Sequence, residues 1–496
     1  MPDGPGTTPA NLMAGEGPDI AQSHSAVLVF FGERAYKFKK PVDLGFLDFS
    51  TVESRERACR RELELNRRLA PDVYLDLAQV LDGDGRVCDW LVVMKRMPAG
   101  RRLSELVRRG EEVTADLRRL ARVLASFHSE ARRGPDVDAT AGLSALRKRW
   151  FDNFSGIEPF AGNVIDRGSL REVAELVQDY VDGRAPLFAD RIDRGCAVDG
   201  HGDLRAEDIF CLPDGPRVLD CLEFDDALRF VDVLDDAAFL VMDLERLGSP
   251  ALAAEFSRAY REFSATPVVR TLEHHYIAYR AFVRAKVACV RRAQGVERAA
   301  GEAQQLLGIS LEHLRAGLPN LVLVGGLPGT GKTTIAGSLA DRLGAVLLRT
   351  DVIRGELPEL AGLPGDSGYG RGRYDPEKVH QTYRVMLDRA RTLLGLGEHV
   401  VLDASWSSAA ERRAARDLAG ATCSRTVELR CAAPPEITEP RITTRADASE
   451  ATPEIAARMR ADFAPWPEAT EIDTAGHPES AEQAAWEALS GATGTR

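Results

Sequence analysis

The chain has 496 residues and a net charge of −12, with 64 Lys and Arg residues against 76 Asp and Glu residues. This length suffices for two or three domains, and the acidic balance argues against nucleic acid and anionic membranes as the main partner. A small nucleic-acid end held in a pocket is an alternative. The eight cysteines are scattered, no Cys-x-x-Cys pair occurs and no apolar run could span a membrane, so we expect a cytoplasmic protein without a zinc module.

The first segments predict a tail followed by a β-hairpin. Residues 1–22 are rich in Pro, Gly, Ala and Thr without periodicity, which is typical of disorder. Ser25–Phe31 and Arg34–Lys39 are apolar or alternating runs on either side of a short Gly-Glu turn. The alternation in the second run places Lys37 and Lys39 on one face of the strand.

A helix follows the hairpin and supplies the partner for a strand lysine. Helical spacing over Arg55–Leu69 places Glu62 on the helix after Lys37. Phosphoryl-transfer sites use such a lysine to hold nucleotide phosphates and such a glutamate to orient the lysine. Lys39 and Lys40 are alternatives to Lys37, and Glu64 is an alternative to Glu62.

Candidate catalytic and metal-binding carboxylates lie further along the chain. The run HGDLRAED occupies residues 201–208 and contains Asp203, which could accept the proton of an attacking hydroxyl group. Asp208 and Asp220, the latter at the end of an apolar strand, are candidate Mg²⁺ ligands. Glu223 is a further acid that could approach the metal.

The order and spacing of these pieces resemble the aminoglycoside phosphotransferase and choline kinase group, relatives of protein kinases, over about residues 24–300. The resemblance implies ATP binding by Lys37 with Glu62, an adenine hinge from Met94 to Met97, a catalytic base at Asp203, metal ligands at Asp208 and Asp220, and a bracing role for Asp236. Two features depart from that group: position 208 is normally Asn, and no Gly-rich lid precedes the lysine. A regulatory, non-catalytic domain is therefore an alternative.

A domain boundary is predicted at Gly317–Pro319, directly before a P-loop. The apolar run Leu321–Val324 predicts a buried parallel strand, and the pattern GxxxxGKT follows at residues 326–333. Backbone N–H groups of such a loop wrap phosphates at the start of a helix, where the helix dipole favours negative charge. The residues expected to bind ATP are Gly326, Gly329, Thr330, Gly331, Lys332, Thr333 and Thr334, with Lys332 also acting on the reacting phosphates and Thr333 holding Mg²⁺.

Further candidates follow the P-loop. Asp351 lies at the end of an apolar strand, where it could activate a substrate hydroxyl, and Arg354 could grip an acidic group. Asp403 ends another apolar strand and is a candidate metal-binding carboxylate. Arg441 and Arg445 are candidate catalytic arginines of a lid, and residues 359–374 read as a loop over the site.

This second pattern resembles P-loop kinases allied to gluconate kinase, polynucleotide kinase and zeta toxins, over about residues 318–490. The whole chain resembles bacterial proteins that fuse an aminoglycoside phosphotransferase-like domain to an ATP-binding domain. The resemblance implies an α+β kinase-like domain at residues 23–316 and an α/β P-loop domain, with a parallel sheet flanked by helices, at residues 317–496.

The predicted activity is ATP- and Mg²⁺-dependent phosphoryl transfer to an alcohol group, with two nucleotide sites. The expected acceptors are small hydroxylated metabolites or antibiotics. One alternative makes the first domain a nucleotide-sensing module beside a single catalytic P-loop kinase. A second alternative is a toxin-like kinase that acts on sugar nucleotides.

Overall fold

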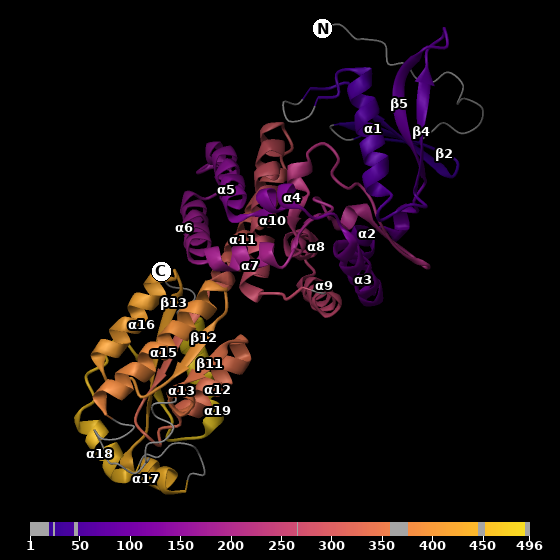
Figure 1. Ribbon diagram of the computed structural model, residues 1–496. Coiled ribbons are helices and arrows are strands. Elements are labelled where there is room, and N and C mark those ends of the chain that lie inside the picture. Colours follow the sequence, from indigo (N-terminus) through magenta and orange to yellow (C-terminus); the bar gives the residue numbers. More distant parts are fainter. Residues whose placement is uncertain are drawn as a thin grey trace. The chain divides into compact units, whose positions relative to one another are not determined.

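The computed structural model describes residues 19–22, 25–43, 48–264, 266–357, 375–444 and 452–491. The chain forms two compact units (Figure 1). The first unit joins Met1–Ala141 to Gly195–Pro267, and the second joins Gly142–Arg194 to Val268–Arg496. Each unit contains its own main sheet and is described by itself.

The first unit is built on an antiparallel sheet with the strand order β1-β2-β3-β5-β4. Its strands are β1 (Asp19–Gln22), β2 (Ala26–Phe31), β3 (Arg34–Lys39), β4 (Tyr74–Leu81) and β5 (Val87–Lys95). The predicted hairpin of β2 and β3 is confirmed, with Leu28 opposite Lys37. Gly32 takes a φ of 54° in its tight turn, a conformation that favours glycine.

Part of the expected tail is ordered. Asp19–Gln22 form β1, in which Ile20 lies opposite Val29 of β2, whereas disorder was expected over residues 1–22. All four residues of β1 are exposed, so backbone pairing with the free edge of β2 stabilises this strand instead of side-chain burial. Composition alone therefore predicted the wrong state here, because edge pairing depends on the sheet and not on the segment. Residues 1–18 lie outside the described part.

Helices and two small strand pairs complete the first unit. The helices are α1 (Val52–Asn66), α2 (Leu103–Arg108), α3 (Thr114–Glu130), α4 (Pro135–Ala141), α8 (Val233–Arg246) and α9 (Pro250–Phe263). The small pairs are β6 (Ala197–Asp199) with β9 (Phe230–Asp232), and β7 (Ile209–Leu212) with β8 (Gly215–Val218). A capping box of Thr51 and Ser54 begins α1, so the helix starts three residues earlier than its apolar spacing predicted.

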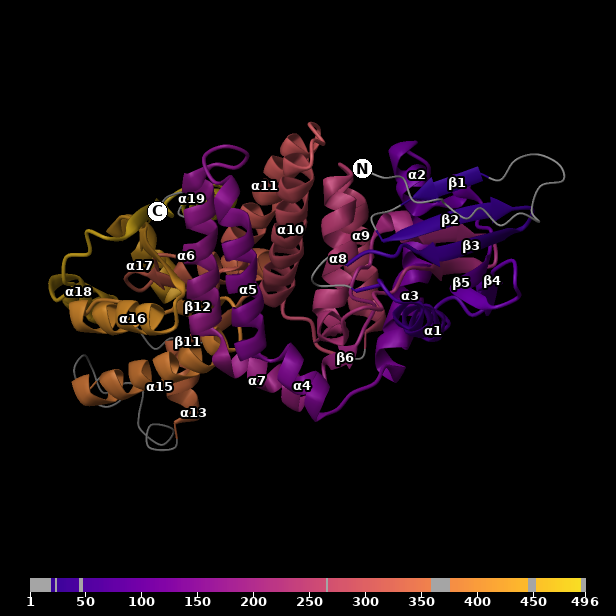
Figure 2. The ribbon, with the colours of Figure 1, turned by 90° about the horizontal axis from the view of Figure 1, so that it is seen from above.

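Within the described residues, five helices of the second unit precede its sheet in the sequence. They are α5 (Leu143–Ile157), α6 (Arg167–Gly183), α7 (Ala185–Asp193), α10 (Arg270–Ala293) and α11 (Ala299–Gly317). Figure 2 shows α5 and α6 beside α10 and α11. These helices belong to the same compact unit as the C-terminal sheet. The domain bounds of 23–316 and 317–496 stay a prediction.

The sheet of the second unit is parallel, with the order β11-β12-β10-β13-β14. Its strands are β10 (Asn320–Gly325), β11 (Val346–Arg349), β12 (Val400–Asp403), β13 (Arg425–Ala432) and β14 (Thr470–Asp473). The helices of this part are α12 (Lys332–Leu343), α13 (Thr350–Glu356), α15 (Pro376–Gly395), α16 (Ala409–Ala421), α17 (Pro435–Thr443), α18 (Pro453–Ala461) and α19 (Pro478–Gly491). The predicted α/β fold class is confirmed.

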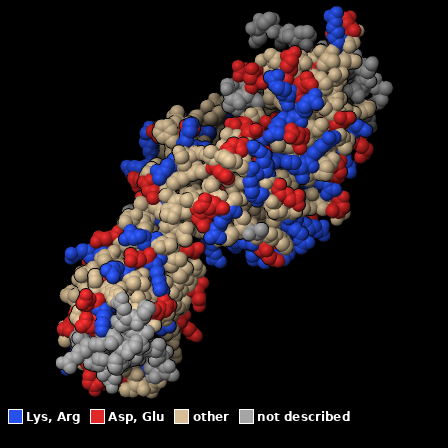
Figure 3. All heavy atoms as spheres, in the orientation of Figure 1, with Lys and Arg blue, Asp and Glu red and all other residues tan. Residues whose placement is uncertain are grey.

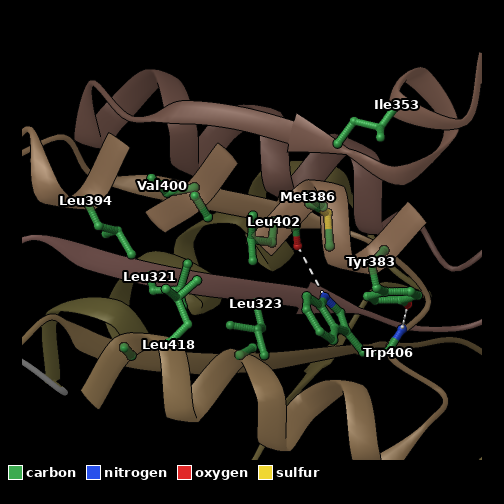
Figure 4. Close-up of a cluster of buried hydrophobic side chains, with 14 of the residues drawn as sticks. Leu321, Leu323, Ile353, Tyr383, Met386, Leu394, Val400, Leu402, Trp406 and Leu418 are labelled. Atoms are coloured by element: carbon green, nitrogen blue, oxygen red, sulfur yellow. Dashed lines mark hydrogen bonds between the residues drawn. The ribbon is translucent and has the colours of Figure 1, made fainter. Parts of the chain in front are cut away.

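Helices cover both faces of the parallel sheet. Leu321 and Leu323 of β10 pack on one face with side chains of α15 and α16, around Trp406 and Tyr383 (Figure 4). Val322 and Val324 point to the other face and pack with α12 and α19. Because both faces are buried, β10 is apolar at four successive positions, as a central parallel strand requires.

Charges of both signs occur on the surface. On the face drawn in Figure 3, basic and acidic side chains are interspersed. Among the described residues, no helix combines the length and the apolar character needed to cross a membrane.

Candidate functional site

The first unit brings Lys37, Glu62 and Asp220 together from three segments. Lys37 lies on β3, Glu62 lies on α1, and Asp220 follows β8. The Nζ atom of Lys37 lies 2.6 Å from Glu62 Oε1 and 2.5 Å from Asp220 Oδ1. The Glu62 side chain is fully buried, whereas the Asp220 side chain is 43% exposed. The cluster therefore presents a fixed ammonium group beside an accessible carboxylate.

The charges of this cluster stabilise one another. Burial alone would lower the pKa of Lys37, but Asp220 and Glu62 outweigh burial and raise the pKa well above its ordinary value. Burial would raise the pKa of Glu62, and the two neighbouring lysines lower it instead. Lys37 lowers the pKa of Asp220, against the effect of burial. All three groups are therefore charged at neutral pH.

The structure separates the alternative residues on β3 and α1. Lys39 also meets Glu62, with 2.7 Å between Nζ and Oε2, and pairs with Glu223 as well. Glu64 instead pairs with Arg61 and is 68% exposed, so of the two candidate glutamates on α1 it is Glu62 that contacts the strand lysines. The sequence did not predict that Lys37 and Lys39 share one glutamate. Their placement on the same face of β3 was the pattern that could have indicated it.

The loop at residues 201–208 is braced from α8. Asp236 accepts hydrogen bonds from the amides of His201 at 2.7 Å and Gly202 at 2.8 Å, which is the bracing role that the resemblance implies. Asp243 accepts a hydrogen bond from the Ala206 amide at 2.9 Å. Gly202 has a φ of 86°, which favours glycine at that position. The backbone that carries Asp203 and Asp208 is therefore fixed at both ends.

Arg205 contacts both predicted side chains of this loop. Its Nε atom lies 3.0 Å from Asp203 Oδ2, and its Nη2 atom lies 3.1 Å from Asp208 Oδ2. Burial raises the pKa of Asp208 well above its ordinary value, although Arg205 opposes this effect. Sequence reasoning missed Arg205; its spacing of three residues from Asp208 was the available signal.

The backbone at Asp220 is strained. Asp220 has a φ of 64°, and its amide donates a hydrogen bond to the Tyr74 hydroxyl group at 3.1 Å. A left-handed conformation costs a non-glycine residue about 1–3 kcal/mol and is concentrated at functional positions. The carboxylate of Asp220 lies 2.5 Å from Nζ of Lys37.

The predicted hinge residues lie at the end of β5: Met94 is within the strand, and Met97 follows it. Met94 is buried in the core of the first unit with Tyr74, Phe210 and Leu219, and Met97 packs against the same cluster. The contact of Met94 and Met97 with adenine stays a prediction.

The P-loop of the second unit lies between β10 and α12. Gly326, Gly329 and Gly331 have φ values of 142°, 79° and 78°. A Cβ atom at Gly326 would lie 2.6 Å from the carbonyl oxygen of Cys431, and one at Gly329 would lie 2.6 Å from that of Thr438. Glycine is therefore required at these positions for the loop to pack closely against its neighbours. The loop precedes α12, so its amides lie at the positive end of the helix dipole.

The hydroxyl residues of the P-loop differ in their surroundings. Thr330 is buried and its hydroxyl group donates to the Leu327 carbonyl oxygen at 2.8 Å, so this side chain shapes the loop. Lys332 and Thr333 begin α12 in partly exposed positions, and Thr334 is exposed. These three positions are accessible to a phosphate chain.

Acidic residues follow β12, which pairs with β10, and β11, which pairs with β12. Asp403 ends β12, is 4% exposed and aligns with Val324 of β10. Asp351 lies in the first turn of α13, after β11, and its Oδ1 atom lies 3.0 Å from Nη1 of Arg354. Substrates of open α/β sheets bind at this edge. Arg349, which sequence reasoning missed, lies 3.4 Å from Asp403 through its Nε atom.

A cavity of about 320 Å³ adjoins the P-loop. Its lining includes Gly329, Thr334, Arg441 and Thr474. Arg441 donates to the carbonyl oxygens of Gly329 at 3.5 Å and Thr474 at 3.1 Å, so it lies beside the loop on α17. Arg445 and the predicted loop at residues 359–374 both lie outside the described residues.

The residues present fit a metal ion shared with nucleotide phosphates. Mg²⁺ commonly uses one or two protein carboxylates, with phosphates and water as its other ligands. In the second unit, Oδ1 of Asp403 is buried without a hydrogen-bond partner, and in the first unit the Asp220 carboxylate is accessible. Among the described residues, no group of three or more His, Cys, Asp or Glu side chains is arranged as a metal site.

Known proteins are similar to the chain in part or over most of its length. The family described as AAA domain matches residues 321–466, which confirms the predicted P-loop domain. Solved structures that match include a sugar kinase from Janibacter sp. (20% identity, 35% of this chain and 95% of that chain, TM-score 0.29). A choline/ethanolamine kinase family protein from Mesorhizobium loti (12%, 62% and 94%, TM-score 0.39) and an aminoglycoside 2'-phosphotransferase (14%, 60% and 94%, TM-score 0.41) also match.

Relatives that match most of the chain come from mycobacteria. Uncharacterised proteins of Mycobacterium bovis and Mycobacterium tuberculosis are each 44% identical over 463 residues, which is 93% of this chain and 93% of each relative. This similarity includes both units. The chain therefore belongs to the same family as these mycobacterial proteins and carries a P-loop domain in its C-terminal part.

Proposed function

We propose that the protein is an ATP- and Mg²⁺-dependent phosphotransferase with two nucleotide sites that acts on small hydroxylated metabolites or antibiotics. The observation that supports two sites is that each compact unit gathers its own phosphate-binding groups. The first unit supplies Lys37 beside Asp220, and the second supplies the P-loop beside Asp403.

In the second unit, the P-loop amides and Lys332 hold the phosphate chain of ATP. Asp351 lies at the sheet edge where an acceptor would bind, and it receives the proton of the acceptor hydroxyl group. Arg354 holds Asp351 through their ion pair, and Arg441 lies beside the P-loop for contact with the nucleotide. Bound Mg²⁺ would neutralise phosphate charge near Asp403 and Thr333.

In the first unit, Lys37 binds phosphates while Glu62 fixes its position. Asp203 receives the proton of a second acceptor, since its side chain is 27% exposed beside the braced loop. Asp220 and Asp208 are the residues that would hold Mg²⁺ there.

The test is an acceptor screen on the full chain, with ATP consumption as the readout. The panel contains sugars, aminoglycosides, amino alcohols, nucleosides and sugar nucleotides. Each active acceptor is then measured with Lys332→Ala, Asp203→Asn and the two changes combined. We expect each acceptor to lose at least about 100-fold in rate with one of the single changes. Lys148→Ala and Asp214→Asn remove exposed charges and serve as matched controls.

The outcomes separate the proposal from its alternatives. If Asp203→Asn changes no rate while the first unit still binds ATP, that unit is a nucleotide-sensing module. Turnover with sugar nucleotides alone, lost in Lys332→Ala, would assign the second unit to toxin-like chemistry. ATP consumption that survives the combined change would contradict both predicted sites.

A further inference from the structure

Arg205 lies within an acidic cluster of the first unit. Besides its contacts of 3.0 Å with Asp203 and 3.1 Å with Asp208, its guanidinium group pairs with Glu207. The Arg205 side chain is only 16% exposed, and that of Asp208 is 18% exposed. Ion pairs so shielded from water are screened less by salt than pairs on an open surface.

The backbone around Arg205 is held from three directions. The Ala206 amide donates to Asp243 of α8 at 2.9 Å, and the Asp208 amide donates to the Arg205 carbonyl oxygen at 3.0 Å. The Leu219 amide donates to the Asp208 carbonyl oxygen at 2.9 Å, next to Asp220. The loop at residues 201–208 is therefore linked to the segment after β8, and the backbone that carries Arg205 is held in place.

The cluster needs a cation besides Lys37. Lys37 is already paired with Glu62 and Asp220, so it does not compensate Asp203 or Asp208. Without Arg205, these two carboxyl groups would meet the negative phosphates of a nucleotide with no cation beside them, and Asp208 would lose the group that opposes the rise of its pKa by burial. A planar guanidinium group can contact two carboxylates at once through different nitrogens, which fixes their separation as well as their charge.

We propose that Arg205 is a positioning residue of the first unit's nucleotide site, which neutralises Asp208 and holds Asp203 in place for the acceptor hydroxyl group. This inference rests on the proposed function of that unit. An ordinary ion pair on the surface would contribute little to stability or activity, whereas Arg205 is assigned a role in the function of this site.

The first test measures Mn²⁺ binding by electron paramagnetic resonance, without nucleotide, in the full chain. The parent carries Lys332→Ala and Asp403→Asn to disable the P-loop site. We expect Arg205→Gln to raise Mn²⁺ affinity about tenfold and Asp208→Asn to lower it about tenfold, because the two changes have opposite charge. Combining both changes restores the net charge of the parent, so the affinity should return to within about threefold of the parent.

The second test measures slow ATP hydrolysis, with water as the acceptor, in the same parent. Arg205→Lys keeps the positive charge but loses the planar fork. We expect its Mn²⁺ affinity to stay within about threefold of the parent and kcat to fall about tenfold, with little change in KM for ATP. This variant also carries the test if Arg205→Gln fails to fold. Glu207→Gln removes a partner that is 45% exposed and should leave kcat within about twofold.

The proposal is overturned if Arg205→Gln and Asp208→Asn shift Mn²⁺ affinity in the same direction, or if Arg205→Lys keeps the full kcat. Failure of the proposed function looks different, because the parent would then bind ATP at no site while the opposite Mn²⁺ shifts could still be seen. A parent that binds neither Mn²⁺ nor ATP overturns both.

Discussion

Glu62 is the residue on which the charge balance of the first unit depends. Its two oxygens contact Lys37 and Lys39, which lie on the same face of β3, and its side chain is fully buried. Because Glu62 is buried, water cannot solvate the two ammonium groups in its place if its charge is removed. Removing one charge from such a network leaves the others desolvated and uncompensated, which is more costly than losing a surface pair.

We therefore expect Glu62→Gln to destabilise the first unit by about 3–5 kcal/mol. The measurement is hydrogen exchange of the β3 and α1 amides in the full chain, which should become faster than in the wild type. Glu64→Gln is the matched control on the same helix, because Glu64 is 68% exposed and pairs only at the surface. Its effect should stay below about 1 kcal/mol. Equal effects of the two changes would show that the buried network is not the source of stability.

At the level of single residues, the sequence predicted the groups that belong to motifs and missed their partners. Lys37 and Glu62 were placed by strand and helix patterns, and the structure joins them. The pair of Lys39 with Glu223 spans 184 positions, so no local pattern could indicate it. Arg205 is the opposite case, since its partners are near in sequence but a spacing of three residues is equally common on exposed surfaces.

At the level of elements, α10 is joined to α5 and α6 by a buried histidine. His275 is fully buried, stacks on Tyr180 with 4.4 Å between ring centres, and lies 3.2 Å through Nε2 from the indole nitrogen of Trp150. The indole N–H donates, so Nε2 must accept and carries no proton. Burial lowers the pKa of His275 to about 3.

This arrangement predicts how stability depends on pH. An unfolded histidine has a pKa of about 6.5, so between about pH 6.5 and pH 3 the unfolded chain binds a proton that the folded chain does not. The stability of the second unit should therefore fall by about 2 kcal/mol between pH 7 and pH 5 because of His275. His275→Gln keeps an acceptor for Trp150 and should remove this part of the pH dependence.

Urea unfolding followed by tryptophan fluorescence tests the pH prediction, since Trp150, Trp406, Trp466 and Trp486 all belong to the second unit. The difference in unfolding free energy between wild type and His275→Gln should narrow as the pH falls. His477→Gln removes an exposed histidine of the same unit and should leave the pH dependence unchanged. A difference that stays constant from pH 7 to pH 5 would contradict the role of His275.

The link between α6 and the parallel sheet is also testable. Arg184 follows α6, is fully buried, and donates to the carbonyl oxygens of Thr422 at 2.7 Å and Cys423 at 3.3 Å. Arg184→Met should cost the second unit about 2–4 kcal/mol, because buried carbonyl groups would lose their donors. The same fluorescence measurement applies. Arg147→Met, which removes a side chain that is 42% exposed, should cost less than about 1 kcal/mol.

At the level of the whole molecule, the sequence predicted both fold types but not how the chain is divided between compact units. The strand, P-loop and helix pattern at residues 320–343 is local, so it was readable without the structure. The place of α5, α6, α10 and α11 depends on which apolar faces meet, and a helical pattern does not say which sheet will cover it. Residue contacts such as that of Arg184 with Thr422 are what decide it.

Two nucleotide sites in separate units predict a binding stoichiometry. The wild-type chain should bind two equivalents of a non-hydrolysable ATP analogue in the presence of Mg²⁺, measured by equilibrium dialysis. Lys332→Ala should remove one equivalent by disabling the P-loop, and Asp220→Asn should remove the other by removing a carboxylate beside Lys37. Asparagine tolerates the left-handed backbone at position 220, so the loss would report on charge and not on the fold. Binding of one equivalent by the wild type, abolished by Lys332→Ala alone, would leave the first unit without a nucleotide site.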